Sequence, residues 1–432
     1  MINPNTATLA QLESLPGVSV AEATAVITHR PYASAADLLK VIWLPPAAIA
    51  GLTFDTVTPP TPPTPPINPP VPTPPVAVGV LGWLPPAPVD FSLPEWAIPG
   101  GNPIIGTGGN INITKGGTYA GKFVDMTMST LEAVVLNGVT AQTLNIESAG
   151  NLAITNSTFS GGKPIPEANT AVAIWRWNNL VIENNQFNGL GLLVSHFNPA
   201  MASCRIRFNR GLNISGATGP TTRVKCSFIQ LAGVHAPNIE IAWNCVTNER
   251  GKSAVEDNIS LMQAGGVAAS PLKHHDNCVE GQYGYPVGTH SSGSCFMLND
   301  PGLTENYADG GYVDFYNNLA IDGENQAFAQ AGSYDIACHD NVAVKDGTGS
   351  TQGSMVAQVW NWDNRTPADL FGKNCTFAGN IYWWLIDGNP SVPRISPPVV
   401  SGGNQQVKMS QAGQLAAYLA RAKAAAVVFG PK

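Results

Sequence analysis

A short phrase that recurs through the middle of the chain constrains its fold more than any other feature. The phrase alternates apolar residues, then gives a polar pair ending in a fixed Asn and a further apolar residue, as in NLVIENNQF, NIEIAWNCV, YVDFYNNLA and DIACHDNVA. Alignment of the copies places the fixed Asn at seven positions spaced 23 to 41 residues apart: Asn185, Asn209, Asn244, Asn277, Asn318, Asn341 and Asn380. A phrase that returns at a variable step of this size predicts a solenoid.

Each copy of the phrase predicts one coil with two short strands joined at the Asn turn. Because apolar residues alternate along the strands, one face of each strand points inward. A single coil cannot bury that face, but stacked coils can. Asn tolerates the left-handed conformation of a tight corner and can hydrogen-bond the backbone there. Since coils stack about 4.8 Å apart, we expect the Asn side chains to form a ladder in a parallel β-helix over residues 109–390.

The phrase resembles that of the pectate-lyase-like family of right-handed parallel β-helices, in which an Asn ladder occupies one turn. The resemblance covers about 280 residues and implies a mainly β fold. It implies no single activity, because this fold carries lyases, hydrolases, adhesins and phage spikes alike.

The first 57 residues predict a separate, all-helical unit. Helical patterns at Thr6–Ser14 and Val20–Thr28 flank a hairpin made of Leu15, Pro16, Gly17 and Val18, and PYASAADLLKV begins a second such arrangement. These phrases resemble the tandem helix-hairpin-helix of DNA-uptake competence proteins, a resemblance that implies DNA-phosphate binding through hairpin N–H groups.

Two departures from that pattern weigh against DNA binding by this unit. The second Gly of the first hairpin is Ser19, and the second hairpin has Pro46, which lacks an N–H donor. Its basic residues are only His29, Arg30 and Lys40. We therefore expect residues 1–57 to anchor the chain to other proteins, and we do not expect them to bind DNA.

The remaining segments predict a linker and two caps. Residues 58–75 contain 11 prolines in 18 positions, which predicts a polyproline II linker. Residues 76–108, with Trp83, Phe91 and Trp96, are expected to cap the first coil. Residues 391–432 are expected to form a C-terminal cap with a helix over Ser410–Val428, which either caps the last coil or joins protomers.

Composition limits the classes of partner and cofactor. The net charge of −7 gives no general attraction to nucleic acid, and the apolar stretches are too short to span a bilayer. Motifs for metals, nucleotide phosphates and a nucleophile elbow are missing, so no cofactor or metal is expected. The seven cysteines are expected to be small buried hydrophobes. Cys245 and Cys278 each follow a ladder Asn, so a disulfide between them is geometrically possible, although a cytoplasmic origin argues against it.

Candidate site residues come from the middle coils and the long segment Val279–Gly311. Carboxylates in a groove are the groups that cleave polysaccharides, which selects Glu256, Asp257, Asp300 and Asp309 as catalytic candidates. Aromatic and imidazole rings beside carboxylates suit sugar binding, which selects His290, Tyr283, Tyr285, Tyr307, Trp360 and Trp362. The alternative for each is an exposed polar or structural residue, and the carboxylate phrases of polygalacturonases are absent.

An anchoring unit, a stiff linker and a β-helix together predict an appendage. The N-terminus lacks a basic region followed by an apolar run, which indicates a protein without a signal peptide. We therefore predict a bacteriophage virion protein (a tailspike, tail fibre or capsid-attached spike) made in the host cytoplasm. Its β-helix would contact host surface polysaccharide, and a homotrimer is possible. The alternatives are a polysaccharide lyase or glycoside hydrolase, which needs two carboxylates about 5–9.5 Å apart, and a purely structural decoration protein.

Overall fold

The computed structural model divides the chain into two compact units, Met1–Val76 and Ala77–Lys432. The structure describes residues 2–16, 18, 23, 26–27, 30, 32, 49, 51–53, 86, 88–161, 165, 169–195, 202–289, 293–301, 310–350 and 352–432. The predicted polyproline linker, Trp83, Gly17 and the second hairpin lie outside the described residues. Each unit is considered by itself.

In the N-terminal unit, helix α1 (Leu9–Glu13) begins at a capping box. The Thr8 hydroxyl accepts the Gln11 N–H, and the Gln11 side chain accepts the Thr8 N–H at 2.8 Å. Leu12 and Leu15 are buried in a small core with Val26. The guanidinium of Arg30 donates to the carbonyls of Pro4 and Ala7, so this basic residue ties the unit together from within.

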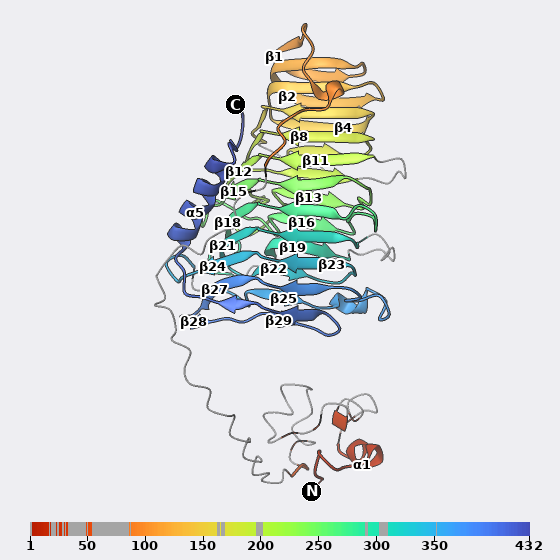
Figure 1. The fold of residues 1–432 in the computed structure, drawn as a ribbon, viewed down its shortest axis with the longest axis vertical. Coiled ribbons are helices and arrows are strands. Elements are labelled where there is room, and N and C mark those ends of the chain that lie inside the picture. Colours follow the sequence, from red (N-terminus) through yellow and green to blue (C-terminus); the bar gives the residue numbers. More distant parts are fainter. Residues whose placement is uncertain are drawn as a thin grey trace. The chain divides into compact units, whose positions relative to one another are not determined.

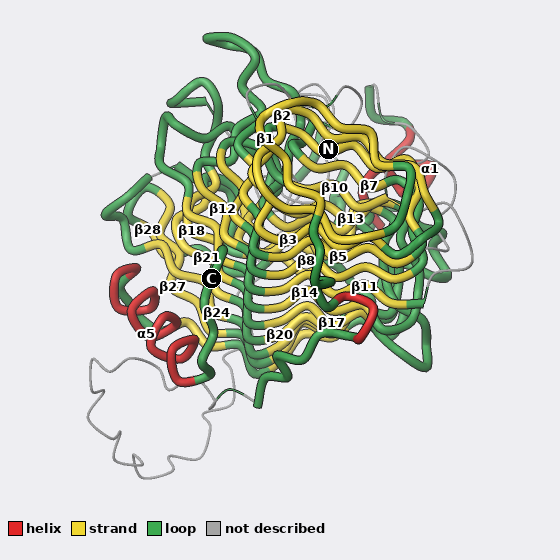
Figure 2. Tube along the Cα trace, turned by 90° about the horizontal axis from the view of Figure 1, so that it is seen from above, coloured by secondary structure: helices red, strands yellow, loops and turns green. Residues whose placement is uncertain are grey.

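The second unit is a solenoid of parallel strands, so the predicted mainly β fold is confirmed. The chain winds in repeated coils (Figures 1 and 2), and among the described strands only β27 and β28 pair antiparallel. The coils begin with three long strands that pair in succession: β1 (Ile104–Ile113), β2 (Gly117–Thr130) and β3 (Val134–Ala141).

After β3, the strands separate into three stacks, each holding one short strand per coil. Stack A contains β5 (Asn151–Thr155), β8 (Asn179–Glu183), β11 (Ser203–Arg207), β14 (Ile239–Ala242), β17 (Leu272–His275), β20 (Val313–Tyr316), β23 (Ile336–His339), β26 (Thr376–Ala378) and β30 (Val400–Gly402). Stack B contains β6 (Thr158–Phe159), β9 (Gln186–Asn188), β12 (Arg210–Leu212), β15 (Cys245–Thr247), β18 (Cys278–Gln282), β21 (Leu319–Gly323), β24 (Val342–Lys345), β27 (Ile381–Ile386) and β31 (Gln405–Gln406). Stack C contains β4 (Thr143–Ala149), β7 (Val172–Ile174), β10 (Leu192–Ser195), β13 (Ile229–Ala232), β16 (Ile259–Met262), β19 (Ser294–Asp300), β22 (Gln326–Gln330), β25 (Ala357–Val359) and β29 (Arg394–Ile395).

The alternation of apolar residues predicted from the phrase fills the space between the three stacks. In β14, for example, Ile239 and Ile241 are buried in the core while Glu240 faces outward. The same two inward positions are apolar in the strands of stack A from β5 to β23, except that β17 has the buried His274 at the second, so one continuous core runs through the solenoid. All seven cysteines are free thiols, and Cys245 and Cys278 are in-register neighbours in stack B.

The seven fixed Asn residues occupy a single column at the turn between stacks A and B. Each side-chain amide donates to the Oδ1 atom of the Asn in the next coil at 2.9 to 3.1 Å, and each backbone N–H donates to the same oxygen. The column continues to Asn404, which the phrase alignment misses. Because the amides are buried, these bonds satisfy groups that would otherwise be costly to remove from water.

The left-handed residue at this turn is the one before the ladder Asn, which corrects the sequence-based assignment. Asn184, Asp276 and Asn317 have φ of 55°, 57° and 54°, whereas no ladder Asn has a positive φ. Phe208 (61°) and Trp243 (54°) occupy the same position, although bulky residues rarely adopt this conformation. The ladder Asn has an ordinary backbone conformation, and its side-chain amide donates to backbone carbonyls at the turn.

The C-terminal segment explains why bulky residues are accepted at that position. Helix α5 (Gln411–Ala424) packs along the side of the solenoid against β21 and β24 rather than over its last coil (Figure 1). The Tyr418 ring lies 6.1 Å from the Trp243 ring, and the Gly430 N–H donates to the Phe208 carbonyl at 2.9 Å. We call residues 410–432 the C-terminal strap, because it contacts successive left-handed residues along the column.

The described residues 88–98 of the predicted N-terminal cap also lie along the side of the solenoid. This segment contains a short 3-10 helix, η1 (Glu95–Ala97), beside which Leu93 and Trp96 pack on Val181 and neighbouring apolar residues. The carbonyl of Ser92 accepts from Arg205 at 2.8 Å. The segment 88–98 therefore covers the outer face of the first coils of stack A.

Candidate functional site

The outer face of stack A carries two columns of side chains that line up across the coils. In the first column the register aligns Val181, Arg205, Glu240, Lys273 and Asp314. In the second it aligns Glu183, Arg207, Ala242, His275, Tyr316 and His339. Parallel in-register pairing places neighbours in each column about 4.8 Å apart, so side chains far apart in sequence form one continuous surface.

Ion pairs link the upper half of this surface. Glu183 pairs with Arg205 at 2.6 Å and with Arg207 at 2.8 Å. Glu240 pairs with Arg207 at 3.4 Å and with the His275 ring at 3.2 Å. Glu183 and Arg207 are largely buried, and such buried pairs hold their geometry because breaking one leaves an uncompensated charge.

The lower half of the surface contains three stacked rings. The Tyr316 ring lies 4.8 Å from the His275 ring and 5.4 Å from the His339 ring, with nearly parallel planes. Both nitrogens of His339 contact carboxylates, at 2.9 Å to Asp314 and 2.7 Å to Asp340. The hydrogen bond to Asp314 raises the pKa of His339 and outweighs the opposing effect of burial, bringing it to about 9. His339 is therefore a fixed cation at neutral pH.

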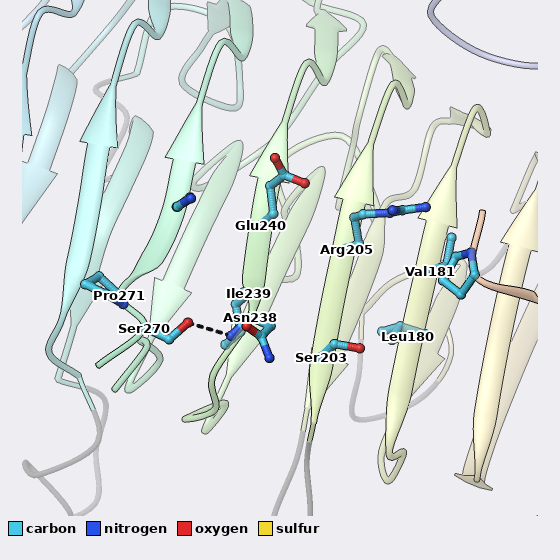
Figure 3. Close-up of a pocket in the computed structure, with 11 residues that line it drawn as sticks. Leu180, Val181, Ser203, Arg205, Asn238, Ile239, Glu240, Ser270 and Pro271 are labelled. Carbon is cyan, nitrogen blue, oxygen red and sulfur yellow. Dashed lines mark hydrogen bonds between the residues drawn. The ribbon is translucent and has the colours of Figure 1, made fainter. Parts of the chain in front are cut away.

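A pocket of about 330 Å³ opens at the upper end of the same face. Side chains from β8, β11, β14 and β17 and from the loops before them line it (Figure 3). Pro94 is a further lining residue. Ser203, Asn238 and Ser270 supply hydroxyl and amide groups, and Ser270 accepts the Asn238 backbone N–H at 2.9 Å (Figure 3). Arg205, Glu240 and Lys273 supply its charges.

The charged side chains of the pocket differ in whether they have ion-pair partners within the protein. Burial raises the pKa of Glu240, but the His275 hydrogen bond and the charge of Arg207 outweigh it, so the pKa lies below its ordinary value. Glu240 is thus an ionised, paired carboxylate. Arg205 is held by Glu183 and Ser92. Lys273 is exposed and forms no ion pair with any residue that the structure describes.

The predicted catalytic carboxylates lie elsewhere. Asp257 is buried and accepts both the backbone N–H and the hydroxyl of Ser294, at 2.7 and 2.6 Å. Glu256 pairs with the exposed Lys225 at 3.1 Å. Asp300 ends β19 in stack C, and Asp309 lies outside the described residues. None of the three described carboxylates lines the pocket on stack A.

The predicted glycan-binding residues also fall outside the pocket. Tyr283 is buried, and its hydroxyl donates to Asp322 at 3.0 Å within a cluster that includes the buried Glu324. The Tyr285 hydroxyl donates to the Gly219 carbonyl. Trp360 and Trp362 pack on Met297 and two alanines on the outer face of stack C. His290 and Tyr307 lie outside the described residues.

The pocket residues that the sequence analysis missed were nevertheless visible in the repeat. Glu240 and Lys273 stand at one outward step of the phrase, in NIEIAWNCV and PLKHHDNCV. Arg205 stands at the same step before Asn209. Charges at a fixed outward position in adjacent coils must lie side by side, so that step of the alignment could have revealed the site.

The described lining of the pocket holds one carboxylate beside hydroxyl, amide and cationic groups. Cleavage by a pair of carboxylates requires two such groups across the scissile bond, and Glu240 is the single carboxylate among the described lining residues. Among the residues that the structure describes, no three His, Cys, Asp or Glu side chains are grouped so that they could hold a metal ion. Hydroxyl, amide and charged groups on one open face instead match the donors and acceptors of a saccharide.

Comparison with known proteins identifies the N-terminal unit alone. Residues 1–53 match the model of the helix-hairpin-helix motif, in agreement with the sequence-based assignment. No curated protein and no solved structure shows a significant match to the chain. Within the described part of the chain, no helix has the length and apolar character needed to cross a membrane.

Proposed function

We propose that this chain is a bacteriophage virion appendage whose β-helix binds a host surface glycan. The observation that carries the proposal is the pocket on the outer face of stack A, built by adjacent coils and rich in hydroxyl, amide and charged groups. Its lining comes from four in-register strands of the solenoid and the residues just before them, and sites of this kind are usually largely pre-formed. Binding therefore needs little ordering of the protein.

The N-terminal unit is proposed to dock on other virion proteins. Support comes from its charge, because residues 1–57 contain four acidic residues against Arg30 and Lys40. Arg30 is also engaged with backbone carbonyls of its own unit, which leaves little cationic surface for DNA phosphates. The protein is proposed to reside in the virion after synthesis in the host cytoplasm, and a homotrimer is compatible with this role.

Binding to purified bacterial surface polysaccharides on an array tests the glycan proposal. Ser203 lines the pocket from the start of β11, so Ser203→Tyr should fill it and abolish binding of any polysaccharide that the unaltered chain retains. Thr376→Tyr is the matched control, because Thr376 is an outward residue of stack A in β26, away from the pocket. Folding of each variant is checked by its thermal transition.

Two results would overturn the proposal. If the full chain retains no polysaccharide, the proposal that it binds glycan is wrong. If a folded Ser203→Tyr variant retains polysaccharide as well as the unaltered chain does, the pocket is not the binding site. The appendage role is tested separately by mass spectrometry of purified phage particles. Deletion of residues 1–57 should leave the solenoid folded but absent from particles, whereas incorporation of the truncated chain would contradict the docking role.

A further inference from the structure

We infer that the saccharide taken by the stack A pocket is anionic and that Lys273 contacts its acidic group. This inference rests on the proposed function and adds the charge class of the ligand. It follows from the pairing of the three charged side chains that line the pocket.

Two of those charges are already neutralised inside the protein. Glu183 lies 2.6 Å from the Arg205 guanidinium, and the Ser92 carbonyl accepts from the same group at 2.8 Å. Both oxygens of Glu240 are engaged, one by His275 at 3.2 Å and one by Arg207 at 3.4 Å. Each of these two side chains therefore already has a partner of opposite charge inside the protein.

Lys273 is the exception among the described charged residues of the pocket. Its neighbours in the column are Glu240 and Asp314, and both of these carboxylates are paired with imidazole rings. The Lys273 amine is exposed and has no ion-pair partner among the described residues. It therefore stands as the surplus positive charge of the pocket.

The groups around Lys273 define how an acidic saccharide would sit. Ser203, Asn238 and Ser270 lie along the edge of the pocket where the stack A strands begin, and the charged column lies further along the strands. Hydroxyls of a sugar ring can exchange hydrogen bonds with the first set. A carboxylate or phosphate on the ring would then meet Lys273, and a charge-assisted bond of this kind is stronger than a neutral one.

The test uses the full chain and matched polysaccharides that differ in charge. The array carries bacterial polysaccharides with uronic acid residues, the same samples after carboxyl reduction, polysaccharides with phosphodiester groups, and neutral ones. Binding should be confined to anionic samples. Loss of binding on carboxyl reduction identifies a carboxylate as the anion, whereas binding confined to the phosphodiester samples identifies phosphate.

Variants of Lys273 assign the contact. Lys273→Gln should weaken binding of the anionic polysaccharide about tenfold or more, and Lys273→Arg should retain most of it. Lys122→Gln is the control, because Lys122 is exposed in β2, far from the pocket, and its loss changes net charge equally. If Lys122→Gln weakens binding as much as Lys273→Gln does, the loss of binding follows from the change in net charge, and the assigned contact of Lys273 with the anion is wrong.

The inference and the proposed function fail in different ways. Binding to neutral samples that survives Lys273→Gln but is lost in Ser203→Tyr overturns the anionic class and leaves glycan binding in place. Absence of binding to every sample overturns the proposed function itself.

Discussion

The hydroxyl of Tyr418 in α5 donates a 2.8 Å hydrogen bond to the carbonyl of Asp276, the left-handed residue that precedes a ladder Asn. The two residues are 142 positions apart in sequence. The Asp276 carboxylate also pairs with Arg421 of the same helix and with His275 of the outer face of stack A. Asp276 thus connects the C-terminal strap to the surface that carries the pocket.

Removal of the Tyr418 hydroxyl should loosen the strap. Tyr418→Phe keeps the ring packing on Trp243 and loses one buried hydrogen bond, which we expect to cost about 1 kcal/mol. Hydrogen exchange of the α5 amides should become faster, while the ladder amides stay protected. Leu419→Ala is the control, because Leu419 lies on the exposed side of the helix. Unchanged exchange in α5 after Tyr418→Phe would show that the bond does not hold the strap.

The Asn ladder should be far more sensitive in its middle than at its end. Asn277→Ala leaves the backbone N–H of Asn244 without its acceptor in a fully buried site, at an expected cost of about 2–4 kcal/mol. Asn404→Ala should cost less than about 1 kcal/mol, because Asn404 is partly exposed and water can replace its bonds. Denaturant midpoints measure both, and equal losses would contradict a ladder that depends on burial.

The solenoid was predictable because its signal is repeated in every coil. Each copy of the phrase, such as those that contain Asn277 and Asn318, predicts both the inward-facing apolar residues and the turn. Several copies therefore support the same prediction of a solenoid. The left-handed residue was misplaced because Asn or Asp occupies both turn positions in four of the seven copies, and only the copies with Phe208, Trp243 and Gly379 separate the two. Helix α5 was predictable from the helical spacing of its apolar residues. The position where it packs on the solenoid depends on contacts with Asp276, which no local sequence pattern indicates.

The site was less predictable because the residue types that suggest chemistry lie elsewhere in the coils than the positions that form the shared outer face. Carboxylates and aromatics in the long loop, such as Asp300 and Tyr283, suggested chemistry, whereas Tyr283 serves an internal contact in the fold. The backbones of Arg205 and Lys273 lie about 9.6 Å apart across two coils, although the residues are far apart in sequence. This proximity follows only from the register of the strands. Loop length depends on each coil separately, so it carried little information about this shared face.

The titration of His339 should be displaced to alkaline pH. Its pKa in the folded chain is about 9, against about 6.5 in an unfolded chain. The interaction with Asp314 and Asp340 is therefore fully present below about pH 6.5 and is lost as pH rises through about 9. NMR of the ring signals should show this midpoint, and Asp314→Asn should lower it. A midpoint near 6.5 in the unaltered chain would contradict the clamped geometry.

Asp257 should give the opposite kind of pH dependence. Burial raises its pKa to about 7, although the Ser294 hydrogen bond opposes the rise, and an unfolded Asp titrates near about 3.9. Between these values the folded state holds a proton that the unfolded state releases, so stability falls as pH increases, by at most about 1.4 kcal/mol per pH unit. Asp257→Asn keeps an acceptor for Ser294 and carries no titrating proton.

The variant should therefore lose this slope between about pH 4 and pH 7 and become more stable than the unaltered chain at the upper end. Denaturant midpoints across that range provide the measurement. Asp387→Asn is the control for the change in net charge, because Asp387 is exposed in the turn before β28 (Asn389–Pro390). Parallel pH profiles for the unaltered chain and Asp257→Asn would show that the carboxyl is ionised in the folded state, and the buried Ser294 contact would then have to stabilise a charge.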